Sequence, residues 1–254
     1  MTTVVSVHSF RGGTGKSNIT ANTAAKLTAA GHRVGIIDTD IQSPGIHVLF
    51  GFGDDLTDTL NDYLWGRERI EQAAHDVTAV IAATTTVAPG GVLYLIPSSM
   101  RPQEIARVLR EGYDVVTLNE GFRDLARSLR LDYLFIDTHP GLNEETMLSI
   151  TISDVLLLIL RPDKQDFQGT AVTVDIARRL SVPSLLLVLN KIPGGIDTAD
   201  LRAQVDEAYG AQTVAALPLS EQLVVNASGS LFSLTHPDHP WSQQINAIAD
   251  ALAR

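Results

Sequence analysis

The chain has 254 residues, of which 44% are hydrophobic and 19% are charged, a balance typical of a globular protein with a sizeable core. It contains no cysteine, which excludes disulfide bonds, thiolate metal sites and cysteine nucleophiles. The net charge of −10 disfavours general affinity for nucleic acid or anionic lipid, because both attract positive charge. No apolar run is long enough to span a membrane, and the first residues lack a signal peptide's basic start, so we expect a cytoplasmic protein.

Short apolar runs alternate with amphipathic helical patterns along the chain. Buried strands are predicted at residues 4–7, 33–37, 92–96, 132–136, 155–160, 185–190 and 214–217. Helices are predicted at residues 18–30, 54–65, 67–74, 101–111, 118–129, 170–180, 199–209 and 242–253. This alternation is typical of an α/β protein with a doubly wound, mostly parallel sheet and helices on both faces. No repeat, low-complexity segment or linker interrupts it, so we expect residues 1–254 to form a single domain.

A glycine-rich segment between the first strand and the first helix predicts a phosphate-binding loop. Its backbone amides and the helix N-terminus favour an anion, and glycines let the backbone approach the phosphates. Lys16 is expected to reach the β- and γ-phosphates, while the Ser17 hydroxyl is free for Mg²⁺. The residues expected to contact the nucleotide here are Arg11, Gly12, Gly13, Thr14, Gly15, Lys16, Ser17 and Asn18.

The loop departs from the common phosphate-loop pattern, because Phe10 stands where that pattern has its first glycine. Instead, a cationic residue, Arg11, precedes a Gly-Gly pair. This resembles the deviant Walker A loop of the MinD/ParA superfamily of dimeric ATPases, in which the cation is normally lysine. The resemblance extends over about residues 3–226 and implies that Arg11 acts on the nucleotide of the other subunit. A purely structural Arg11 is the alternative, because arginine greatly outnumbers lysine in this chain.

Acidic residues follow two of the predicted strands, at the edge where doubly wound sheets bind ligands. Asp137 ends an apolar strand in the Walker B manner, and together with Ser17 it is expected to support Mg²⁺. An aspartate at a strand end can also cap a turn, but the neighbouring phosphate loop favours a role at the metal. The resemblance implies that Asp38 also supports the metal and that Asp40 orients the attacking water. The expected catalytic residues are therefore Lys16, Asp40 and Arg11.

Residues 137–142 resemble the second switch of the same superfamily. There Gly141 would offer its amide to the γ-phosphate. The superfamily usually has proline or alanine where this chain has His139. We expect His139 to be a solvated loop residue; sensing of the phosphate or of a partner is the alternative.

The end of the sixth predicted strand and the residues that follow it, Asn190 to Pro193, bear on the choice of base. GTPases carry Asn-Lys-x-Asp at this place, and here Pro193 replaces the aspartate that binds guanine. Asn190 remains available to hydrogen-bond adenine, and Pro218 matches the proline that packs on adenine in the superfamily. We therefore expect ATP and ADP, with Mg²⁺, as the ligands.

Together these features predict a Mg-dependent ATPase that forms an ATP-sandwich homodimer, responds to a protein partner and acts as a positioning or regulatory switch. The alternatives are a very slow or non-hydrolysing interaction module and a phosphotransferase or synthetase on the same fold. Iron–sulfur carriers, nitrogenase reductase-like proteins and arsenite-pump ATPases of this fold use cysteine ligands. Because the chain has none, we expect it to belong to none of these groups.

Two surfaces bear on other partners. DNA binding is not expected, because residues 181–254 carry only a few basic side chains, and the arginines of residues 101–130 are expected to form a solvated face rather than a docking patch. Direct membrane anchoring is not expected either. The last helix has an apolar stripe but lacks the cations of surface-bound membrane helices, so we expect it to pack on the core. The stripe consists of Trp241, Ile245, Ile248 and Leu252.

Overall fold

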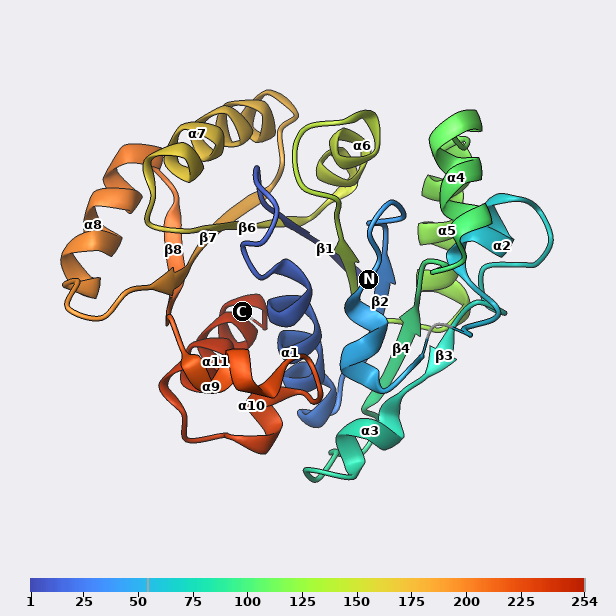
Figure 1. The fold of residues 1–254 in the computed structure, drawn as a ribbon, viewed down its shortest axis with the longest axis horizontal. Coiled ribbons are helices and arrows are strands. Elements are labelled where there is room, and N and C mark those ends of the chain that lie inside the picture. The colour runs from blue at the N-terminus through green and yellow to red at the C-terminus, as the bar shows by residue number, and fades with distance from the viewer. Residues whose placement is uncertain (54, 254) are drawn as a thin grey trace.

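The computed structural model describes residues 1–53 and 55–253, and Figure 1 shows it as a ribbon. Its strands are β1 (Thr3–His8), β2 (Arg33–Asp38), β3 (His75–Asp76), β4 (Val92–Ile96), β5 (Tyr133–Asp137), β6 (Val155–Leu160), β7 (Ser184–Ile192) and β8 (Gln212–Pro218). They form a sheet in the order β3-β4-β2-β5-β1-β6-β7-β8. Among the strands of the described residues, only β3 pairs antiparallel, with β4. The expected α/β class with a mostly parallel sheet is confirmed.

Helices lie on both faces of the sheet (Figure 1). On one face the core joins the sheet to α1, α10 and α11. On the other face it joins the sheet to α2, α4 and α5 at one end and to α7 and α8 at the other. The helices are α1 (Lys16–Ala29), η1 (Ile46–Phe50), α2 (Leu60–Leu64), α3 (Thr78–Ala82), α4 (Pro102–Glu111), α5 (Val115–Ser128), α6 (Glu144–Ile152), α7 (Lys164–Arg179), α8 (Thr198–Tyr209), α9 (Glu221–Asn226), α10 (Phe232–Thr235) and α11 (Pro240–Leu252).

The alternation of side chains along the strands explains the two cores. Along β6, Leu157 and Ile159 face the core beneath α1, while Leu158 and Leu160 face α7 and α8. All four side chains are buried, as expected for a parallel strand covered on both faces. The central strands are therefore held rigidly, and their carboxyl ends provide a fixed edge.

The predicted helices at residues 54–65 and 67–74 are largely wrong. In the described part of these two spans only α2 is helical, and the predicted start at Asp54 lies outside the described residues. Gly66 ends α2 in the left-handed region, at φ 67°. On either side of Gly66, Trp65 and Arg67 both donate hydrogen bonds to Glu104 of α4, over 2.7 and 2.8 Å. These hydrogen bonds tie the chain to α4, and the helix predicted at residues 67–74 does not form.

The apolar stripe of α11 packs on the core, as expected. Trp241, Ile245 and Ile248 are fully buried, and Leu252 is nearly so. In the part of the chain that the structure describes, no helix combines the length and the apolar character needed to cross a bilayer.

Candidate nucleotide-binding site

The phosphate loop connects the carboxyl end of β1 to the start of α1, as the sequence predicts. Gly13 and Gly15 have φ values of 72° and 99°, in the region that favours glycine. At Gly15 a second constraint applies, because an added Cβ would lie 2.5 Å from Nδ2 of Asn190. Lys16 is the first residue of α1 and is buried. The geometry thus places the amides of the loop and of the helix N-terminus at the edge of the sheet.

The side chain of Lys16 lies among acidic groups. Burial lowers the pKa of Lys16, and the carboxylates of Asp137, Asp40 and Asp38, in that order, oppose the change. Its Nζ donates a hydrogen bond of 3.2 Å to Oγ of Ser9. The three expected strand-end acids and the expected catalytic lysine therefore do converge at one place.

Asp38 and Asp137 are direct neighbours, because β2 and β5 pair in a register that aligns them. Each is only 1% exposed. Burial raises the pKa of Asp137 to about 6, although the Ser17 hydroxyl and Lys16 oppose this, and burial together with Asp137 raises the pKa of Asp38. Two neighbouring buried carboxyl groups are costly as anions unless a cation binds between them.

The residues present fit Mg²⁺ bound together with a phosphate. Ser17 lies within hydrogen-bonding range of Asp137, which pairs with Asp38, so the three expected metal residues form one group. Among the described residues, no set of three or more His, Cys, Asp or Glu side chains is arranged to hold a metal alone. Mg²⁺ characteristically uses one or two carboxylates with waters and substrate phosphates, so two carboxylates and one hydroxyl are a suitable set of protein ligands.

Asp40 is bonded to the second switch. Its Oδ1 lies 2.7 Å from Nδ1 of His139 and also accepts hydrogen bonds from the hydroxyl and amide of Ser43, at 2.9 and 3.2 Å. The side chain of His139 is only 24% exposed. The expectation that His139 is a solvated loop residue is therefore wrong. Nothing in the local sequence indicates this contact, which joins loops 99 residues apart.

Gly141 also lies at this edge, with φ at 86°. Its amide donates to the carbonyl of Ser9 over 3.2 Å. The second switch is thereby attached to the first residue of the phosphate loop. For the amide of Gly141 to meet a γ-phosphate, this hydrogen bond would have to open.

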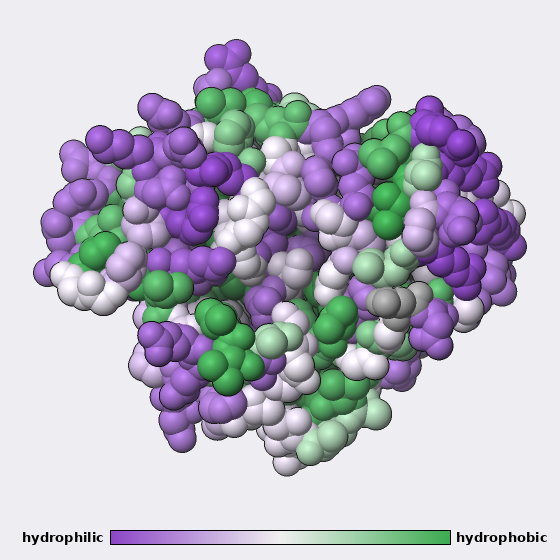
Figure 2. Space-filling model, viewed as in Figure 1, coloured by the Kyte–Doolittle hydropathy of each residue, from purple (hydrophilic) through white to green (hydrophobic). Residues whose placement is uncertain are grey.

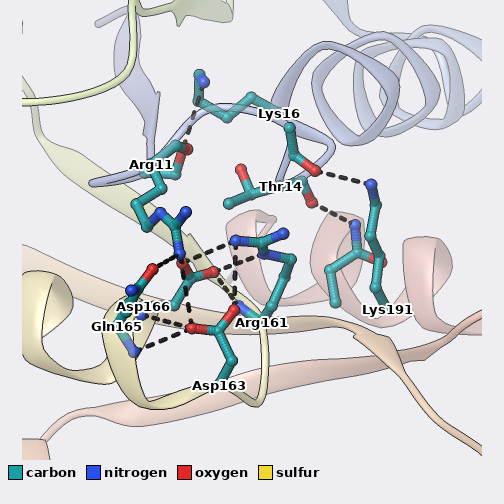
Figure 3. Close-up of polar contacts among 11 residues, drawn as sticks. Arg11, Thr14, Lys16, Arg161, Asp163, Gln165, Asp166 and Lys191 are labelled. Carbon is teal, nitrogen blue, oxygen red and sulfur yellow. Dashed lines mark hydrogen bonds and ion pairs between the residues drawn. The ribbon is translucent and has the colours of Figure 1, made fainter.

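Arg11 points away from the rest of the loop, toward the start of α7 (Figure 3). Its Nη1 donates to Oε1 of Gln165 and lies 3.9 and 3.8 Å from carboxylate oxygens of Asp163 and Asp166. Arg161 holds Asp166 with two further hydrogen bonds, of 2.8 and 3.0 Å. In this arrangement Arg11 makes its contacts within its own chain.

The base-side residues lie at the ends of β7 and β8. The Nδ2 of Asn190 donates one hydrogen bond to the carbonyl of Thr14 over 2.7 Å, and its Oδ1 can still accept a hydrogen bond from a base. Pro218 borders a cavity of about 370 Å³ whose lining includes Ile192, Pro193 and Leu219. Such a hollow at the carboxyl ends of β7 and β8, lined by apolar and by polar groups, has room for a flat aromatic base.

Comparison with known proteins gives the family. The family model described as "ParA: NUBPL iron-transfer P-loop NTPase" matches residues 1–253. The chain belongs to this family. The expectation that it stands apart from the iron–sulfur carriers is therefore wrong as a statement of kinship, although the chain lacks their cysteines. This ParA-family chain is 24% identical over 253 residues to an uncharacterized ATP-binding protein of Methanocaldococcus jannaschii, covering 99% of this chain and 88% of that protein. It is 27% identical over 263 residues to an iron-sulfur cluster carrier protein of Deinococcus radiodurans, covering 98% of this chain and 69% of the carrier.

Solved structures give the same fold. The MinD cell division protein of Aquifex aeolicus superposes with a TM-score of 0.79 at 19% identity, covering 99% of this chain and 96% of that one. MinD of Pyrococcus horikoshii, complexed with Mg-ADP, superposes with a TM-score of 0.79 at 20% identity, covering 100% of this chain and 97% of that one. The resemblance to the MinD/ParA superfamily that the sequence indicates is confirmed.

Proposed function

We propose that this ParA-family NTPase is a Mg-dependent ATPase whose ATP-bound form is a homodimer and which serves as a positioning or regulatory switch. The observation that carries the proposal is the convergence of Asp38, Asp40 and Asp137 around Lys16 beside a phosphate loop. A structural role alone does not account for this cluster, because burying Asp38 and Asp137 side by side costs stability. A bound nucleotide with its cation offsets that cost.

The proposed chemistry is cleavage of the bond between the β- and γ-phosphates by water. Ser17, Asp38 and Asp137 would hold Mg²⁺, which supplies charge neutralisation at the phosphate oxygens. Lys16 and the loop amides stabilise negative charge on the β- and γ-phosphates. Asp40 accepts a hydrogen bond from the attacking water and orients it, a role that depends on position more than on basicity.

The choice of ATP over GTP rests on the ends of β7 and β8. Pro193 has no carboxylate for a guanine edge, and Pro218 borders the cavity where a base would lie, while Asn190 lies near the end of β7 against the phosphate loop. The exposed apolar surface of α9, the helix that follows β8, supports a dimer. No side chain of α9 is buried, and its Val224 and Val225 are 71% and 83% exposed. Figure 2 shows an apolar patch over α9, on a face where hydrophilic side chains predominate.

Iron transfer, which the family description names, is not proposed for this chain. Iron–sulfur clusters are held by cysteine thiolates, and these 254 residues contain no cysteine. Nor do the described residues gather histidines and carboxylates into a substitute site. The residues present therefore do not fit a cluster as cargo.

The rival that the structure favours next is a nucleotide-dependent module that hydrolyses ATP very slowly or not at all. It gains support from Arg11, which contacts α7 and is directed away from the loop. Interaction with DNA or direct insertion into a membrane is not proposed, because the net charge is −10 and the stripe of α11 is buried.

Single-turnover hydrolysis of ATP with Mg²⁺, without any acceptor, tests the proposal. We expect release of inorganic phosphate by the wild type. We expect nucleotide binding to weaken by about tenfold or more in Lys16→Ala, because a buried cation on the phosphates is lost. ATP that binds but stays intact would favour the non-hydrolysing module. Transfer of phosphate only when an acceptor is added would favour a phosphotransferase.

A further inference from the structure

The end of β7 carries an irregularity that the proposed chemistry does not use. Along β7 and β8 the paired residues run from Leu189–Ala216 to Ile192–Pro218, so β7 has one residue more than its partner. This is a β-bulge at residues 190–191. Bulges beside active sites redirect side chains, and they disrupt the strand pairing where they occur.

The backbone within the bulge is unusual as well. Lys191 has φ at 57°, in the left-handed region that long side chains rarely adopt. Such a conformation persists where surrounding contacts hold it. For Lys191 the contact is its own side chain, whose Nζ donates to the carbonyl of Gly13 over 2.7 Å.

The bulge directs two consecutive side chains at two consecutive carbonyl groups of the phosphate loop (Figure 3). Asn190 donates to Thr14 O and Lys191 to Gly13 O, each over 2.7 Å. The side chain of Asn190 is buried, whereas Lys191 is exposed at the rim. With both carbonyls directed toward β7, the peptide units that contain them are fixed, and so are the N–H groups on their other side.

We infer that Asn190 and Lys191 are positioning residues that hold the phosphate loop in its anion-binding shape. Lys191 acts through the loop backbone, and its ammonium adds positive potential beside the phosphates. The constraint at Gly15 belongs to the same contact, because only glycine leaves room for the amide of Asn190. The inference rests on the proposed nucleotide site, and it deepens that site by extending it to the bulge of β7.

The test compares four variants by calorimetric titration with ADP. Lys191→Met removes the ammonium and keeps the length of the side chain. Lys191→Gly also removes it but relieves the left-handed backbone, whereas Lys191→Arg keeps a donor. The matched control is Lys164→Met, which removes an exposed cation at the start of α7. None of these positions touches the nucleotide in the proposed chemistry.

We expect about fivefold weaker ADP binding in Lys191→Met and Lys191→Gly, as for loss of an accessible charge-assisted hydrogen bond. Lys191→Arg and Lys164→Met should stay within about twofold of the wild type. In all four variants the rate of hydrolysis at saturating ATP should stay within about twofold of the wild type, because none of them changes a residue that acts on the γ-phosphate. Wild-type affinity in Lys191→Met would overturn the inference, as would an equal loss in Lys164→Met. If Lys191→Met bound ADP weakly and Lys191→Gly bound it as the wild type does, the weaker binding would come from backbone strain. That result would overturn the inference too.

A second readout needs no nucleotide and separates this inference from the proposed function. The amide ¹H–¹⁵N signal of Thr14 reports on the hydrogen bond to the adjoining Gly13 carbonyl. We expect this signal to move in Lys191→Met and to remain in place in Lys164→Met. If the wild type failed to bind ADP, the proposed function would fall while this measurement still decided whether Lys191 holds the loop. An unmoved signal in Lys191→Met would overturn the inference.

Discussion

The Nδ1 atom of His139 lies 2.7 Å from Oδ1 of Asp40, so a hydrogen bond joins the loop after β2 to the loop after β5. Because a carboxylate can only accept, the histidine donates. Oδ1 of Asp40 already accepts two hydrogen bonds from Ser43, and the bond from His139 adds a third donor. One of the two oxygens that could orient water is therefore fully engaged.

We predict that His139→Ala raises the basal rate of ATP hydrolysis about threefold, because one donor fewer then competes with the attacking water for Oδ1 of Asp40. Nucleotide affinity should not change. Phosphate release under single-turnover conditions measures the rate, and His32→Ala, a half-buried histidine far from the site, serves as the control. A rate below that of the wild type would show that His139 holds Asp40 in its working position.

The buried carboxyl group of Asp137 predicts a dependence of stability on pH. Its pKa is about 6 in the folded protein against 3.8 ordinarily, so between these values the folded chain binds the proton more tightly than the unfolded chain. The free energy of unfolding therefore falls as the pH rises from about 4 to about 6, and the loss persists at pH 7.

Asp137→Asn removes this titration and should be more stable than the wild type at pH 7, by roughly 3 kcal/mol. The same change removes a negative charge beside Asp38, whose pKa Asp137 raises, so the ionised form of Asp38 becomes less costly. Urea unfolding in a chelator measures the difference, and Asp175→Asn on the exposed face of α7 is the control. A variant less stable than the wild type at pH 7 would refute the sign of this effect.

The contact between Arg11 and the start of α7 bears on how two subunits would cooperate. We predict that Arg11 leaves Asp163 and Asp166 on dimerisation and contacts the nucleotide of the partner, where its planar fork takes two phosphate oxygens. Mixing Lys16→Ala subunits with Arg11→Ala subunits should then restore part of the hydrolysis that each lacks alone. Normal dimerisation and hydrolysis by Arg11→Ala alone would exclude a role across the dimer.

Burial of the α11 stripe leads to a prediction about membranes. Because Trp241 and Ile245 are fully buried, the helix has no apolar face to insert. The protein with Mg·ATP should therefore stay in the supernatant when vesicles rich in phosphatidylserine are sedimented. Sedimentation with these vesicles, but not with neutral ones, would contradict this.

Local patterns in the sequence predict much of the site. The phosphate loop, Asp38 and Asp137 are read from short segments whose strand–turn–helix context fixes where they lie. The contacts of His139 and Lys191 are not predictable in this way, because each depends on a partner far along the chain. A β-bulge such as that at Lys191 becomes visible only when two strands are paired.

Helix prediction failed where periodicity was weak or misleading. Residues 144–152 form α6, but apolar side chains such as Met147, Ile150 and Ile152 leave no clear polar face to mark it. Its start has a local signal nonetheless, since Asn143 accepts a hydrogen bond from the amide of Thr146 as an N-cap. The leucines at residues 56, 60 and 64 suggested a longer α2, which Gly66 and the contacts to α4 prevent.

In the proposed switch, ATP joins two copies of this chain through its γ-phosphate. Light scattering with size-exclusion chromatography of Asp40→Ala tests it most directly, because this variant should bind ATP without consuming it. We predict the mass of a dimer with Mg·ATP and of a monomer with Mg·ADP, and a monomer in both for Asp40→Ala combined with Lys16→Ala. A monomer with Mg·ATP, at concentrations where calorimetry shows ATP bound, would contradict the account.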